Sequence, residues 1–145
     1  MSVNGWSLVR FVHVTAAMGW VGGQLLLSLV VLPVLRAQLD PEARGPLVRV
    51  TARRFALVAN AVLLPALLAT GLALMWHRGV GLSAFDDPGY GRLLGIKLVL
   101  VVASVALAAV HGVLALSRPR LARPLAMTGL ASSLGIVVFA TALVP

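Results

Sequence analysis

Hydrophobic residues form four long runs along the chain, and few polar residues interrupt them. The runs cover residues 10–35, 54–76, 92–116 and 125–144. About 20 consecutive apolar residues are enough for a helix to cross the hydrocarbon core of a bilayer. The pattern therefore predicts an all-α integral membrane protein. We expect four transmembrane helices, joined by short loops, to form one antiparallel bundle domain over residues 1–145.

The first run carries polar side chains on one helical face. His13, Trp20 and Gln24 fall on a single stripe when each residue turns the helix by about 100°. A polar stripe on a membrane helix needs protein or water against it rather than lipid. The other helices are therefore expected to pack around this side of the first one.

A second polar stripe lies on the third run, where Lys97, Ser104 and His111 share one helical face. The simplest packing turns this stripe toward the stripe of the first run. In the second run, Asn60 lies at a depth similar to that of His111, and a hydrogen bond between the two is one expectation. Ionisable groups inside a membrane are functional candidates by default.

The distribution of arginine predicts the orientation in the membrane. Residues 36–53 and 117–124 hold most of the arginines, whereas residues 77–91 hold only Arg78. The positive-inside rule puts the two basic loops in the cytoplasm and both termini outside, in a multi-pass protein of the inner (plasma) membrane. The net charge of +8 is explained in this way, so a lipid bilayer is expected as partner and nucleic acid is not.

Composition removes several classes of chemistry. The chain has no cysteine, which excludes disulfides and thiolate metal sites. Its four acidic residues, Asp40, Glu42, Asp86 and Asp87, all lie outside the apolar runs. A carboxylate relay within the membrane therefore has no residues to use, and no catalytic residue is assigned. The sequence favours a protein that binds its ligand over an enzyme.

Two ligands suit the remaining polar groups. Met75 and His77 close the second run at the outer surface, and together with His13 they predict a compact metal site. Imidazole and thioether are suitable ligands for copper, and thioether favours the reduced ion. Haem b is the alternative, because His13 and His77 on facing helices can ligate iron axially. Gly22 and Gly23 would leave room for the flat macrocycle.

Four motifs resemble the copper-resistance D family of inner-membrane proteins. They are FVHVTAAMGWVGG at 11–23, ARRF at 52–55, LLATGLAL at 67–74 and YGRLLGIKLVLV at 90–101. The resemblance implies that the protein binds copper, or helps to translocate it, at an outer-side His/Met site. Members of that family are longer and work beside a periplasmic copper binder. The resemblance therefore implies a homo-oligomer, or a membrane or periplasmic partner protein.

The chain is also similar, in outline, to the bacterial membrane protoporphyrinogen oxidases, which are associated with haem. The residues that match are His13, Trp20 and Lys97. This resemblance implies a haem-binding oxidoreductase in which these three residues contact the cofactor. A third interpretation, an accessory membrane subunit without catalysis, stays open beside the copper and haem hypotheses.

Overall fold

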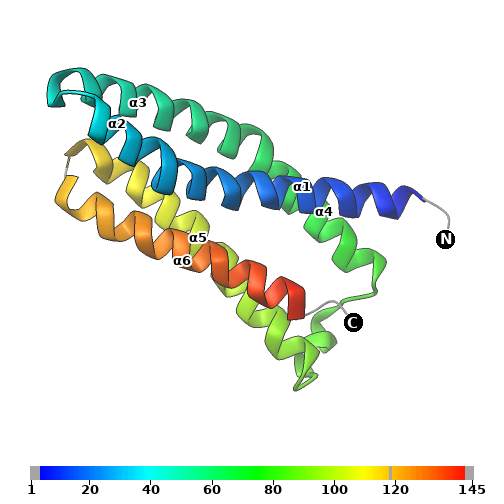
Figure 1. Cartoon of the computed structure of the whole chain (residues 1–145). Helices are drawn as coiled ribbons and strands as arrows, with labels where there is room; N and C mark the ends of the chain where they lie inside the picture. The colour runs from blue at the N-terminus through cyan, green and yellow to red at the C-terminus, as the bar shows by residue number, and fades with distance from the viewer. Residues whose placement is uncertain (1–3, 118, 143–145) are drawn as a thin grey trace. The chain divides into compact units, whose positions relative to one another are not determined.

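A computed structural model describes residues 4–117 and 119–142, with the side chains of Leu82 and of residues 112–123 left out of the description. The described chain is built from helices and turns (Figure 1). Its elements are α1 (Gly5–Leu26), η1 (Leu27–Val31), α2 (Leu32–Gln38), α3 (Pro41–Val58), η2 (Ala59–Leu63), α4 (Leu64–His77), η3 (Leu82–Asp86), α5 (Tyr90–Ser117) and α6 (Pro119–Ala142).

Four helical stretches in the described part of the chain are long and apolar enough to cross a membrane. They are Gly5–Gln38, Pro41–His77, Tyr90–His111 and Pro124–Ala142. The predicted all-α membrane class with four long helices is confirmed. The chain divides into two compact units, Met1–Gly79 and Val80–Pro145, each of which contains one pair of long helices.

Both long helices of the first unit contain a π-helical segment followed by Leu-Pro. In η1 the N–H of Leu32 donates to the carbonyl of Leu27, and in η2 the N–H of Leu64 donates to that of Ala59. Pro33 and Pro65 follow directly. Proline has no N–H and its ring clashes with the carbonyl four residues earlier. The wider π turn relieves that clash, so each helix continues through its proline to α2 or α4.

The expectation that residues 36–53 form a loop is wrong. Helix α2 continues to Gln38, and α3 begins at Pro41. The backbone of Asp40 is extended at the N-cap, Pro41 occupies the first turn, and Glu42 places a negative charge beside the positive end of the helix dipole. These helix-start signals outweigh the polar composition that suggested a loop.

The expected loop over residues 117–124 is also too long. Helix α5 runs to Ser117 and α6 already begins at Pro119. Proline is favoured in the first turn of a helix, where its missing N–H would have no helical partner in any case. Pro124 lies inside α6 rather than before it.

Glycines bring the two helices of the first unit close together. A Cβ added to Gly19 would lie 3.2 Å from Leu63, and one added to Gly23 would clash with the ring of Phe55. Ala59, which lies between these two partners on the second helix, is only 3% exposed. As the residue number rises on α1 it falls on the partner, so the two helices are antiparallel and share a small-residue seam. Figure 1 shows α1 beside α3 and α4.

In the second unit, α5 and α6 pack through two buried hydroxyl groups. The Oγ atoms of Ser104 and Ser133 are 2.8 Å apart, and the residues are 3% and 0% exposed. A Cβ on Gly135 would lie 3.2 Å from Leu100, at the adjacent level of the same antiparallel seam. The hydroxyl of Ser104 is thus paired with Ser133 of α6, the next helix along the chain. That its stripe faces the stripe of the first run stays a prediction, because the two stripes belong to different units.

Candidate functional site

His13 is held on the seam between α1 and α4. Its Nδ1 lies 2.8 Å from the Oγ1 of Thr70, and the residue is half-buried. A Cβ added to Gly71 would lie 3.3 Å from the Cε1 of His13. The Thr-Gly pair therefore supplies both a hydrogen-bond partner for the imidazole and the space in which the ring fits.

The partners of Thr70 decide which way this hydrogen bond runs. The Thr70 hydroxyl donates to the carbonyl of Ala66, one turn earlier in α4. A hydroxyl has a single proton, so toward His13 its oxygen accepts. Nδ1 of His13 is then the protonated nitrogen, and in the neutral ring Nε2 carries the lone pair. This is the tautomer in which Nε2 acts as a ligand.

Met75 is the nearest predicted ligand to His13 on the second helix. It lies four residues after Gly71, one turn nearer the end of α4, and it is half-buried. Residues four apart are neighbours on a helix surface, about 6 Å apart along the axis. The thioether of Met75 therefore belongs to the same end of the α1–α4 seam as the imidazole of His13.

His77 has a different partner. Its ring is stacked on that of Trp6, with centroids 3.8 Å apart and planes 9° from parallel. His77 is the last residue of α4 and is exposed. Thr70, which holds His13, is seven residues earlier, or about 10 Å along the helix. The two imidazoles thus contact different groups at two levels of the first unit.

Trp20 and Gln24 continue the stripe of His13 along α1. Trp20 is 7% exposed and Gln24 is half-buried. The space expected beside Gly23 for a macrocycle is filled by Phe55, so that expectation is wrong for Gly23. An added Cβ at Gly22 would meet nothing within 4 Å. Gly23 therefore makes room for the packing of Phe55 rather than for a cofactor.

The other predicted polar residues lie elsewhere. Asn60 is exposed in η2 and donates from Nδ2 to the carbonyl of Ala56, at 2.8 Å. Lys97 and His111 are half-buried on α5, and both have interaction partners. Contacts of His13 with Lys97, and of Asn60 with His111, stay predictions, because each joins residues of different units.

Sequence reasoning missed Thr70 and Trp6 as partners of the two histidines. Threonine in a membrane helix commonly bonds to its own backbone, as Thr70 does, and this hides its second role. The available signal was the Thr70-Gly71 pair itself, because a hydroxyl beside a position without a side chain can receive a large neighbour. For Trp6 the signal was its place at the apolar boundary, where aromatic rings gather.

The geometry limits the kind of metal site that these residues could form. Among the residues that the structure describes, no three His, Asp or Glu side chains come together as a possible metal site. A closed site of hard or imidazole ligands is therefore not formed by these residues. An imidazole with a neighbouring thioether is a smaller and softer ligand set, which suits reduced copper.

These features define a multi-pass membrane protein with a histidine fixed on a helix–helix seam. No known protein family matches the chain, and no solved structure matches it. The chain is similar to a protein of Aquifex aeolicus (strain VF5) named "Uncharacterized protein", with 42% identity over 98 residues. That alignment covers 68% of this chain and 64% of the relative's own length.

Proposed function

We propose that this protein binds reduced copper in the membrane at His13 and Met75 and helps to pass it across. The observation that carries the proposal is the hydrogen bond between Nδ1 of His13 and Thr70. Histidines that ligate metals commonly donate their second N–H to an oxygen, which fixes the ring and its tautomer. Thr70 plays that part here, and we place the copper at Nε2.

The ligand set supports transfer rather than storage. One imidazole and one thioether satisfy reduced copper only in part, so an entering or leaving ligand can still approach. We propose that a second copy of the chain or a periplasmic partner protein supplies that ligand. His77 lies nearer the end of the helix and is stacked on Trp6, so it contributes less to affinity than Met75.

Copper affinity of single variants tests this site. A competition titration of detergent-purified protein with a chromophoric chelator for reduced copper gives the dissociation constant. We expect His13→Ala to abolish competition and Met75→Leu to weaken it about tenfold, which corresponds to about 1.4 kcal/mol. Met18→Leu is the matched control. Met18 carries a thioether like Met75, but it lies on α1 and is 69% exposed. Equal losses in Met18→Leu and Met75→Leu would refute the proposed ligand set.

An absorption spectrum separates copper from haem. Protein produced with ample haem is expected to show no Soret band in the oxidised or the dithionite-reduced state. A Soret band that is present in the wild type and lost in His13→Ala would replace copper by haem as the ligand of this histidine.

We also propose that the turn between α2 and α3 lies in the cytoplasm and that η3 lies outside. The arginines of α3 support this orientation through the positive-inside rule. Because the chain has no cysteine, single cysteines report their side cleanly. A membrane-impermeant maleimide added to intact cells should label Ser83→Cys and spare Leu47→Cys. The opposite pattern would invert the orientation.

A further inference from the structure

The second long helix of the first unit has a face that α1 does not cover. Phe55, Ala59 and Leu63, spaced four residues apart, are on the side that meets α1. A shallow groove runs along another side, at the junction of α3 and η2. It is lined by Arg53, Ala56, Leu57, Asn60 and Ala61.

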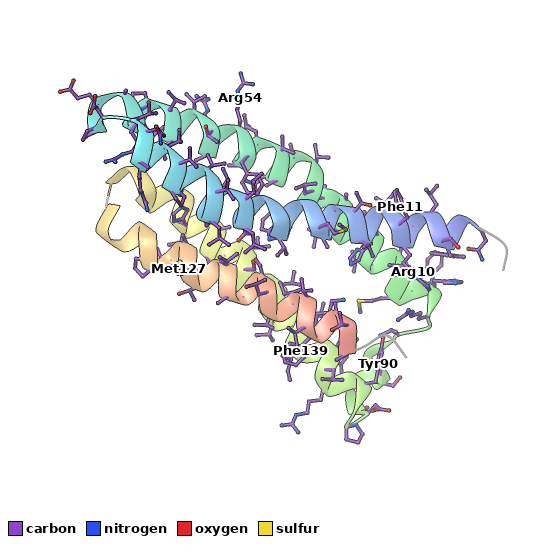
Figure 2. The ribbon with its side chains drawn as sticks, viewed as in Figure 1. Arg10, Phe11, Arg54, Tyr90, Met127 and Phe139 are labelled. Atoms are coloured by element: carbon purple, nitrogen blue, oxygen red, sulfur yellow. The ribbon has the colours of Figure 1, made fainter. Side chains whose placement is uncertain are left out.

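The two ends of this groove differ in chemistry. Arg53 is exposed at one end, and Arg49, one turn earlier, and Arg54 are exposed beside it. Figure 2 shows Arg54 pointing away from α1. The nearest acidic residue of this helix is Glu42, seven residues before Arg49, and no acidic residue occurs between positions 43 and 85. From Arg53 the groove continues over apolar side chains for about 12 Å, to Ala61.

Asn60 is a polar group on the exposed, apolar part of this face. Its Nδ2 donates one N–H to the carbonyl of Ala56, and the amide also has an oxygen and a second N–H that can form hydrogen bonds. It lies about 10 Å from Arg53 along the helix axis. An exposed amide at that depth is costly against hydrocarbon alone, so a molecule that covers this groove with a polar group beside Asn60 would be favoured.

We propose that an anionic phospholipid occupies this groove. Arg53, with Arg49 and Arg54 beside it, holds the phosphate, and the ester region and an acyl chain extend from there over Ala56, Leu57, Asn60 and Ala61. Basic groups next to the hydrocarbon boundary attract anionic headgroups. A free phosphate would leave the apolar floor and Asn60 uncovered, so the amphiphilic groove selects a lipid. The proposal does not depend on the copper site.

Native mass spectrometry of the detergent-purified full chain tests the proposal. The protein is titrated with phosphatidylglycerol and, separately, with phosphatidylcholine of the same acyl chains. We expect the wild type to bind phosphatidylglycerol about tenfold more tightly, because the choline cation of phosphatidylcholine offsets the charge of its phosphate. Arg53→Gln should remove that preference. Asn60→Leu should weaken the binding of both lipids, by a smaller factor.

Arg78→Gln is the matched control, because it removes the same charge from the opposite end of the same unit, where Arg78 is exposed. It should keep the preference of the wild type. Equal affinity for the two lipids in the wild type would overturn the proposal. So would an equal loss in Arg53→Gln and Arg78→Gln, which would indicate only a general effect of net charge.

A dimer that is present in the wild type and lost in Arg53→Gln would also overturn it, because a second copy would then occupy the groove. Circular dichroism of each variant, compared with the wild type, checks that the helices are intact. Should Arg53→Gln fail to fold, Arg53→Lys provides the second test. It keeps the charge but not the paired donors of guanidinium, and it should weaken phosphatidylglycerol binding by a smaller factor.

Discussion

The two helix pairs of this protein use small residues at their seams in different ways. In the first pair, Gly23 receives the ring of Phe55, and Gly71 lies against the ring of His13. In the second pair, the seam holds two hydroxyl groups, those of Ser104 and Ser133, 2.8 Å apart. In the first seam, glycines make room for large side chains of the other helix. In the second seam, small side chains contact each other directly.

This difference separates packing from chemistry. The Ser104–Ser133 pair is neutral, buried and mutually bonded, so it locks two helices without offering a ligand. The seam of the first pair instead carries an imidazole oriented by Thr70. A polar residue on a membrane helix is therefore not evidence of function until its partner is known.

The largest expected effect is a change in unfolding free energy, and it is seen by substituting one glycine from each helix pair. Gly23→Ala places a methyl group on the ring of Phe55, and such overpacking costs about 1–3 kcal/mol. Gly129→Ala places its Cβ 3.7 Å from Leu107, an ordinary contact, and should stabilise α6 by up to about 1 kcal/mol through helix propensity. Unfolding free energies in mixed micelles measure both. A loss of equal size in the two variants would remove the distinction between the seams.

Thr70→Val tests whether the seam hydroxyl orients His13. The change keeps the shape and removes the acceptor, and loss of such a partner typically weakens metal binding at least tenfold. We expect a tenfold weaker copper affinity, and a loss of stability of only about 0.6 kcal/mol. Thr128→Val is the control, because Thr128 also bonds to its own helix, at the carbonyl of Pro124 in α6. Unchanged affinity in Thr70→Val would contradict the orienting role.

A double-mutant cycle examines the second seam. Ser133→Ala removes one partner of a buried hydroxyl and should cost about 1 kcal/mol. Adding Ser104→Ala should recover most of that loss, because no polar group of the pair is then left buried. Additive losses in the double variant would show that the two hydroxyls act independently.

The smallest effect concerns His77. Its ring is stacked on Trp6, so His77→Ala should change copper affinity by less than about twofold. Trp6→Ala should lower the stability of the first pair by about 1 kcal/mol through the lost ring contact. A large loss of copper binding in His77→Ala would return His77 to the ligand set beside His13 and Met75.

The apolar runs were enough to predict four long helices, because their length against the bilayer is a one-dimensional property of the chain. The loops were harder. Arg36 and Arg44 suggested irregular chain, but Asp40, Pro41 and Glu42 start a helix there, and α3 carries its arginines on a helical surface. For the site, periodicity identified the His13 stripe, but it did not identify Thr70 or distinguish the roles of His77 and His13.

The sequence by itself determined the class of this protein, the number of long helices and the polar positions within them, since hydropathy and helical period depend only on residue order. Tertiary structure decided which polar groups meet. Two antiparallel helices have many possible registers, and the one adopted is selected by Gly23 against Phe55 and by His13 against Thr70. That register is a consequence of close packing between segments distant in the chain, and it gives the imidazole of His13 a fixed hydrogen-bond partner.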